Sequence, residues 1–134
     1  MAEIEDLATI LERLEVLRRP GTYVFARSSE PIVDASVEAM IREDEGFTLV
    51  MTREAAESNG LSFDFEAAWL TLAVHSSLAA VGLTATVAGA LAELDIPCNV
   101  IAGFYHDHLL VPVARAEEAI RGIEAVKRYG PPGT

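Results

Sequence analysis

The sequence predicts an α+β protein made of two small halves that share one hydrophobic interior. Hydrophobic residues make up 51% of the 134 residues and charged residues 23%, a composition that is typical of a packed core. Segments whose apolar residues alternate along the chain are interleaved with segments whose apolar residues recur at helical spacing. A half of about 65 residues buries too little surface to be robust alone, so we expect the halves to fold together.

The first half, residues 1–62, is expected to contain two helices and three strands. Apolar residues recur at helical spacing from Leu7 to Leu17, and this helix should end before Pro20-Gly21. Residues 35–42 fit a helix or a strand, and we favour a strand. The expected order is a helix over 7–17, strands over 22–27, 35–42 and 47–52, and a short helix over 53–60.

The second half, residues 63–130, is followed by a short tail at 131–134. Its expected order is a strand over 63–76, a helix over 83–94, strands over 98–104 and 108–113, and a helix over 114–128. This order is most of a βαββαβ unit, the ferredoxin-like arrangement, in which helices cover one face of an antiparallel sheet. The first half contains the same ingredients in a different order. No internal repeat is visible at the level of individual residues.

The long strand expected over residues 63–76 has two largely apolar faces. Leu70, Leu72 and Val74 point to one side, and Trp69, Thr71 and Ala73 to the other. A tryptophan on an open sheet face would expose a costly apolar surface. Either the other half of the chain or a second chain could cover it, and we expect a homodimer with two-fold symmetry.

The charge balance excludes several classes of partner. Twenty-one acidic and 10 basic residues give a formal net charge of −11, which repels nucleic acid and anionic membrane surfaces. The N-terminus is acidic and amphipathic, unlike a signal peptide, and no apolar run approaches the roughly 20 residues needed to span a bilayer. The single cysteine, Cys98, suits a reducing compartment, and burial as a small hydrophobe is expected for it. We therefore expect a cytoplasmic protein.

The segment GLSFDFEAAWLTLAVHSSLAAVGLTATVAGALAELDIPCNVIAGFYHDHLLVP, residues 60–112, closely resembles the small stand-alone bacterial ACT-domain proteins with two ACT-like halves. The upstream segment EGFTLVMTREAAESNG resembles their N-terminal half. A more distant similarity links the chain to the ACT modules of the arginine-sensing CASTOR proteins. The resemblance implies two ACT-like, ferredoxin-like halves and a non-catalytic regulatory or sensing function. ACT domains generally bind amino acids or similar small metabolites, often across a pair of units.

The family pattern places a histidine at the end of a strand, a glycine in the next loop and an asparagine on the second strand. His75, Gly82 and Asn99 fill these positions, although the loop SSLAAVG is longer than usual and lacks proline. The resemblance implies the following ligand-binding residues: His75, Ser76, Val81, Gly82, Leu83, Thr84, Asn99 and Val100.

The residues themselves leave alternatives open at these positions. Glycine at a helix start lets an anionic ligand reach free backbone N–H groups, but Gly82 could also simply begin the helix. Asn99 could hold the ligand or satisfy a neighbouring loop. A Gly82→Val substitution is expected to remove ligand binding and leave the fold intact.

We expect no catalytic residues, no metal and no cofactor. His75-Ser76-Ser77 lacks an acidic partner at a recognisable spacing and the glycines of a nucleophile elbow. His106 and His108 flank Asp107 where two strands must reverse, and they supply only two of the three or four ligands that a metal needs. A hairpin turn is the expected structure there. The alternative function is a protein–protein interaction or structural module with a degenerate pocket.

Overall fold

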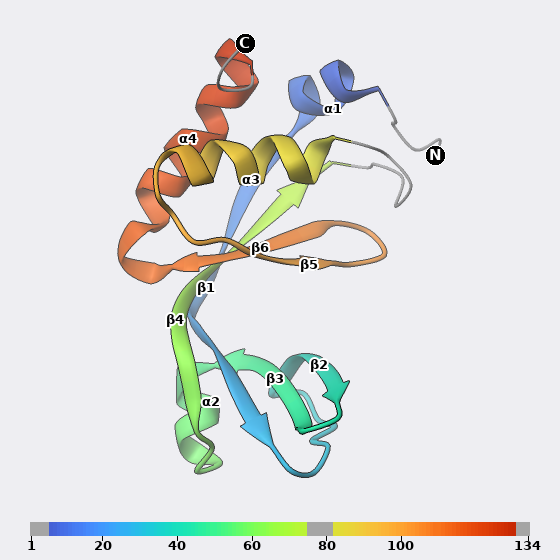
Figure 1. Ribbon diagram of the computed structural model, residues 1–134, viewed down its shortest axis with the longest axis vertical. Coiled ribbons are helices and arrows are strands. Elements are labelled where there is room, and N and C mark those ends of the chain that lie inside the picture. Colours follow the sequence, from blue (N-terminus) through green and yellow to red (C-terminus); the bar gives the residue numbers. More distant parts are fainter. Residues whose placement is uncertain (1–5, 75–81, 131–134) are drawn as a thin grey trace.

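The computed structural model describes residues 6–74 and 82–130. It contains one six-stranded antiparallel sheet in the order β2-β3-β1-β4-β6-β5 (Figure 1). The strands are β1 (Glu15–Ser28), β2 (Val37–Glu43), β3 (Gly46–Thr52), β4 (Phe63–Ala73), β5 (Asn99–Ala102) and β6 (Asp107–Pro112). The helices are α1 (Leu7–Arg13), α2 (Arg53–Ser58), α3 (Leu83–Glu93) and α4 (Ala116–Tyr129), with a 3₁₀ turn at Val113–Arg115. The predicted α+β class is confirmed.

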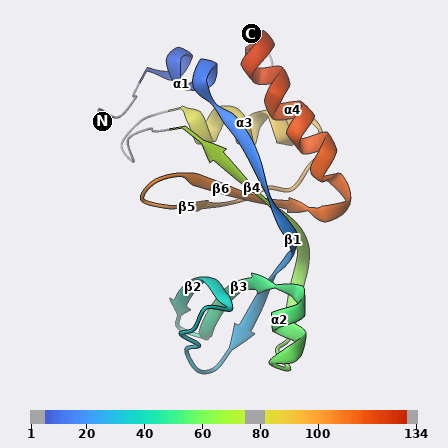
Figure 2. The same ribbon diagram turned by 180° about the vertical axis from the view of Figure 1, so that it is seen from behind.

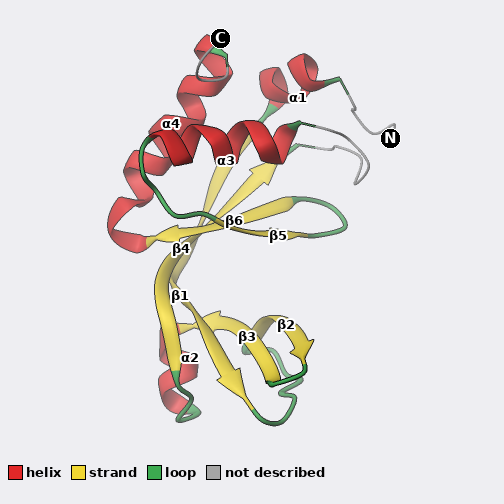
Figure 3. Ribbon diagram, viewed as in Figure 1, coloured by secondary structure: helices red, strands yellow, loops and turns green. Residues whose placement is uncertain are grey.

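The sheet consists of two ferredoxin-like units that share β1 and β4 (Figure 3). The N-terminal unit contains the end of β1, then β2, β3, α2 and the start of β4. The C-terminal unit contains the rest of β4, then α3, β5, β6 and α4, and its last strand is the start of β1. If the strands of each unit are numbered in this order, they lie across the sheet in the order second, third, first, fourth in both units. Each long strand is therefore the first strand of one unit and the fourth strand of the other.

The start of β1 is the main difference from the sequence prediction. The first helix ends at Arg13, and residues 15–19 pair with β4 from Glu15↔Ala73 to Arg19↔Trp69. Leu14 is fully buried and Val16 packs against the same core, whereas Leu17 is 51% exposed. The apolar spacing thus changes from helical to alternating at Leu14. A division of the chain between residues 62 and 63 stays a prediction.

Both shared strands are irregular where the two units meet. Pro20 and Gly21 do not end the strand; the pairing register shifts between Arg19 and Tyr23 and again before Phe25. Across this second shift Phe65, on β4, has a φ of 60°, which is unusual for a non-glycine residue. Such bulges increase strand twist and bending. Figure 2 shows β1 and β4 crossing at this narrow junction, with the remaining elements gathered above and below it.

Helices cover one side of each unit. In the C-terminal unit α1, α3 and α4 bury a core that includes Leu70, Leu91 and Leu109. In the N-terminal unit the short α2 covers a smaller core that includes Leu49 and Met51. Among the described helices, none has the length and hydropathy needed to cross a membrane.

The helix-free face of the sheet carries a third cluster, in which both units take part. Tyr23, Val50, Ala67, Trp69 and Leu110 are buried there. Trp69 is only 3% exposed, and its ring lies 5.3 Å from that of Tyr23 in an edge-on arrangement. The chain itself therefore covers Trp69, which is the first of the two arrangements expected from the sequence.

Candidate functional site

Five of the eight expected site residues lie in the described part of the chain. His75, Ser76 and Val81 lie outside the described residues. Gly82, Leu83 and Thr84 form the start of α3, and Asn99 and Val100 begin the edge strand β5.

Gly82 is needed at its position for two local reasons. Its φ of +111° lies in the left-handed region, which side chains strongly disfavour. A Cβ atom on Gly82 would also lie only 3.2 Å from Cδ2 of Leu7 on α1. A Gly82→Val substitution would therefore strain the backbone and press on the Leu7 side chain; that the fold survives this change stays a prediction.

The first turn of α3 has backbone donors without a side-chain cap. No side chain of the described residues caps the helix at Gly82. The Thr84 hydroxyl on this turn lies 3.5 Å from a carboxylate oxygen of Asp107 at the start of β6. Leu83 is 5% exposed and belongs to the core, so only its backbone could contact a ligand. The arrangement offers N–H groups to an anion and a nearby carboxylate to a cation.

The pairing register separates the two expected residues of β5. Val100 is opposite Leu109, which is opposite Leu70, so Val100 lies on the helix-covered face. Asn99 is opposite Leu110, which is opposite Trp69, so its exposed side chain lies on the helix-free face. The structure thus brings Val100, but not the Asn99 side chain, to the side of the sheet on which α3 begins.

The β5–β6 hairpin is a loop over residues 103–106, in which the Gly103 N–H donates to the His106 carbonyl at 2.9 Å. His108 points from β6 to Trp69: its Nδ1 accepts a hydrogen bond from the indole Nε1 at 3.1 Å and lies 3.0 Å from the Thr71 hydroxyl. Within residues 6–74 and 82–130, no three His, Cys, Asp or Glu residues are grouped so as to hold a metal ion.

Sequence reasoning missed a polar cluster around Trp69. The Arg19 guanidinium lies over the indole ring, with 4.1 Å to its centroid, and pairs with Glu38 of β2 at 2.9 Å. Burial, followed by the charge of Arg19, lowers the pKa of His108 below its usual value. The alternation of Trp69 and Thr71 was visible, but their meeting with Arg19 and His108 depends on the strand register.

Cys98 is half-buried against the core of the C-terminal unit. Burial raises the pKa of its thiol. A raised pKa keeps the thiol protonated and unreactive, which agrees with a packing role.

Comparison with protein families and solved structures gives a consistent result. Two family models described as ACT domain match residues 2–68 and 64–124. No curated protein matches the chain. A Vibrio cholerae protein of unknown function, described as a possible transport protein, is 39% identical, has a TM-score of 0.79, and is aligned over 87% of this chain and 92% of its own.

Two further structures resemble this chain in fold. An Agrobacterium tumefaciens protein is 19% identical, with a TM-score of 0.72 over 86% of this chain and 90% of its own. The aspartate kinase of Clostridium acetobutylicum, described as an allosteric enzyme, is 12% identical, with a TM-score of 0.61 over 87% of this chain but 34% of the kinase. The two matched segments leave little of the sequence outside them, and the chain belongs to the ACT-domain family.

Proposed function

We propose that this protein is a non-catalytic regulator or sensor that binds a small metabolite, an amino acid, through its ACT domains. The proposal rests on one observation: two ACT-domain segments, residues 2–68 and 64–124, make up most of the chain. ACT domains are regulatory modules, and the similar part of the aspartate kinase belongs to an allosteric enzyme.

The geometry at the start of α3 supports an amino acid as the ligand. The uncapped N–H groups after Gly82 suit a carboxylate, because the helix dipole also favours a negative charge there. The Asp107 carboxylate, close to Thr84, suits an α-ammonium group. Together with His75, Ser76 and Val81 from the sequence pattern, and with Val100 and the backbone of Asn99 at the edge strand, these residues form the proposed site.

The proposal extends to location and assembly. A net charge of −11 disfavours nucleic acid and anionic membranes, and a reducing, cytoplasmic location suits the free Cys98. β5 is a four-residue edge strand whose outer backbone groups face away from β6. Edge strands favour pairing with another chain, so we include a two-fold homodimer in the proposal.

The test is a thermal-shift panel of the twenty common amino acids with the wild-type chain. A ligand at 100 times its dissociation constant should stabilise the protein by roughly 2.7 kcal/mol. An Asp107→Asn variant should lose that shift, whereas Asp95→Asn, at the other end of α3, should keep it. A flat panel, or equal shifts in both variants, would contradict amino-acid binding at this site.

A second candidate function, a protein-interaction module, has one observation in its favour. Phe104 and Tyr105, at the tip of the β5–β6 hairpin, are 75% and 70% exposed, and their rings contact each other edge-on at 5.1 Å. Exposed aromatic side chains are enriched at interfaces. A flat amino-acid panel would favour this function.

A further inference from the structure

A cavity of about 340 Å³ lies at the end of the N-terminal unit that is remote from the junction. Residues 27–29 at the end of β1 form one part of its wall, and Glu43 and residues 45–48 of the β2–β3 hairpin form the other. This size is at the lower end of the range of about 300–1,000 Å³ for small-molecule sites. It suits a ligand no larger than a single amino acid or a short amine.

The cavity wall carries a cation and two carboxylates. Arg27 is opposite Thr48 in the sheet, so their side chains share one face. In the described part of the chain no carboxylate forms an ion pair with Arg27, so its guanidinium is available. Glu43 accepts a hydrogen bond from the Thr48 hydroxyl, and Glu45 lies in the turn that follows β2.

The two parts of the wall are held together by close backbone packing. Gly46 has a φ of +142°, and a Cβ atom there would lie 2.9 Å from the carbonyl oxygen of Ser28. The hairpin can approach the end of β1 this closely only because residue 46 is glycine. The cavity is therefore formed by the fold before any ligand arrives.

A short repeat in the sequence relates this cavity to the other unit. β1 ends with Arg27-Ser28 followed by Ser29, and the segment that follows β4 contains His75-Ser76-Ser77. β1 and β4 are the first strands of their respective units. A basic residue and two serines thus occur near the end of the first strand in both, a repeat that becomes visible only when the topology aligns the units.

We propose that this cavity is a second ligand site, for a small molecule that carries one carboxylate and two amino groups. The Arg27 guanidinium would bind the carboxylate in a charge-assisted pair. Glu43 and Glu45 would bind the ammonium groups, because the wall carries one more negative than positive charge and favours a ligand of net positive charge. This site goes beyond the proposed function, since it lies in the N-terminal unit and shares no described residue with the start of α3.

The test adds L-lysine, or cadaverine, which is the same diamine without the carboxylate, to the full chain. Binding is measured by amide NMR shifts and by calorimetry. We expect L-lysine to shift the amide signals of residues 27–29 and 43–48. Arg27→Gln should weaken L-lysine binding at least about tenfold, because it removes the charged partner of the carboxylate, and it should not weaken cadaverine binding. Glu45→Gln should weaken both probes.

Two exposed residues of the same hairpin provide matched controls. Arg42 is opposite Phe47, on the other face from Arg27, and Asp44 precedes Glu45 but does not line the cavity. Arg42→Gln and Asp44→Asn should bind both probes as the wild type does. The absence of shifts at residues 27–29 and 43–48, or equal losses in Arg27→Gln and Arg42→Gln, would overturn the second site. Asp107→Asn, which should affect only signals near α3, reports separately on the proposed function.

Discussion

The two units have the same strand order but very different helical cover. The C-terminal unit packs α1, α3 and α4 over its sheet, whereas the N-terminal unit has only the six-residue α2. A loop over residues 29–36 stands where the C-terminal unit has the helix α3. The N-terminal unit therefore buries a much smaller core. Its stability must come largely from the strands that it shares with its neighbour.

Sharing β1 and β4 has a thermodynamic consequence. Neither unit can lose its fourth strand without breaking the first strand of the other. A small unit with one short helix would be marginal alone. We therefore expect the whole chain to unfold in a single transition despite the unequal cores.

The largest effect is expected at the junction, from Trp69→Ala. This change removes a buried ring that contacts Tyr23, Arg19 and His108, and such truncations cost about 3–5 kcal/mol. Both units should be destabilised together. Urea unfolding followed by circular dichroism measures the change, because Trp69 is the sole tryptophan and its fluorescence is lost with it. Trp69→Phe, which keeps most of the apolar volume, should cost less. Two separate transitions in the wild type would contradict the shared-strand argument.

The two helix-covered cores can be compared directly through Leu109→Ala and Leu49→Ala. Both leucines are fully buried on the third strand of their unit, so each change should cost about 2–5 kcal/mol. Leu109 should cost more, because the cavity beside Leu49 is covered by a short helix that can move inward. Urea unfolding of both variants measures the difference. An equal or larger loss for Leu49→Ala would mean that the smaller core is packed as rigidly as the larger one.

The sequence predicts the fold best where contacts are local. From residue 63 onward the expected order of strands and helices is confirmed, since each element has its own apolar periodicity. The sequence predicts a helix for residues 15–17, because Leu17 continues the helical spacing. Their strand conformation depends on pairing with residues 71–73, more than 50 positions away in the chain, and no local pattern contains that information.

The same limit applies to the sites. The family resemblance points to Gly82 in the sequence, as does its place before a helix, and its left-handed conformation gives a physical reason for glycine there. The contact of Arg19 with Trp69 and the cavity at Arg27 depend on which residues face each other across strands. Alternation along β5 puts Asn99 and Val100 on opposite faces of the sheet. Only the pairing with β6 shows which of the two lies on the helix-covered face.

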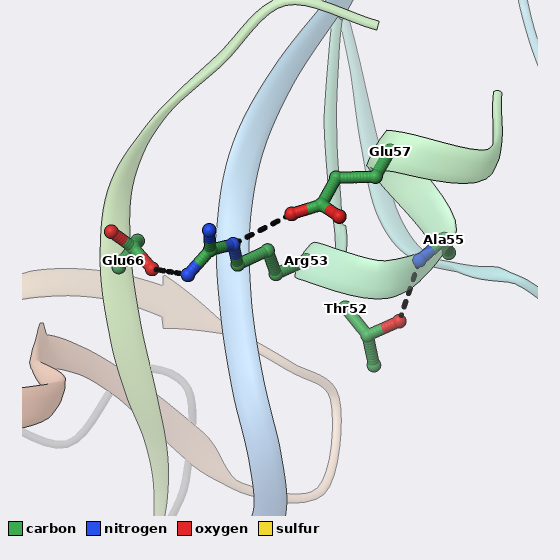
Figure 4. Close-up of polar contacts among 5 residues, drawn as sticks. All are labelled: Thr52, Arg53, Ala55, Glu57 and Glu66. Atoms are coloured by element: carbon green, nitrogen blue, oxygen red, sulfur yellow. Dashed lines mark hydrogen bonds and ion pairs between the residues drawn. The ribbon is translucent and has the colours of Figure 1, made fainter. Parts of the chain in front are cut away.

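Helix capping is a further difference between the units. The Thr52 hydroxyl accepts a hydrogen bond from the Ala55 N–H at the start of α2, and Arg53 then reaches Glu57 and, on β4, Glu66 (Figure 4). α3, which begins at Gly82, has no such side-chain cap among the described residues. Thr52→Ala should cost about 1 kcal/mol, the usual loss for an N-cap. Thr52→Ser, which keeps the acceptor, is the control. A Thr52→Ala protein as stable as Thr52→Ser would show that core packing alone maintains α2.

The smallest effect is expected from the protonation of His108. Its ring is partly exposed, and its surroundings are Trp69 and Thr71 on β4, Arg19 on β1, and Gly103, His106 and Asp107 of its own hairpin. Burial and the positive charges of Arg19 and His106 lower the pKa of His108 in the folded state, and Asp107 opposes them.

The sign of the pH dependence follows from that lowered pKa. Below the unfolded pKa of about 6.5, the unfolded chain binds a proton that the folded chain does not, so stability decreases as the pH falls from 6.5 to the folded pKa. Protonation of Nδ1 would also remove the acceptor of the Trp69 N–H. Urea unfolding of the wild type and His108→Gln between about pH 7.5 and pH 5 isolates this contribution, because carboxyl groups titrate equally in both proteins. His106→Gln is the control on the same hairpin. If the wild type and His108→Gln lose stability in parallel over this range, the Trp69–His108 contact does not distinguish the two protonation states.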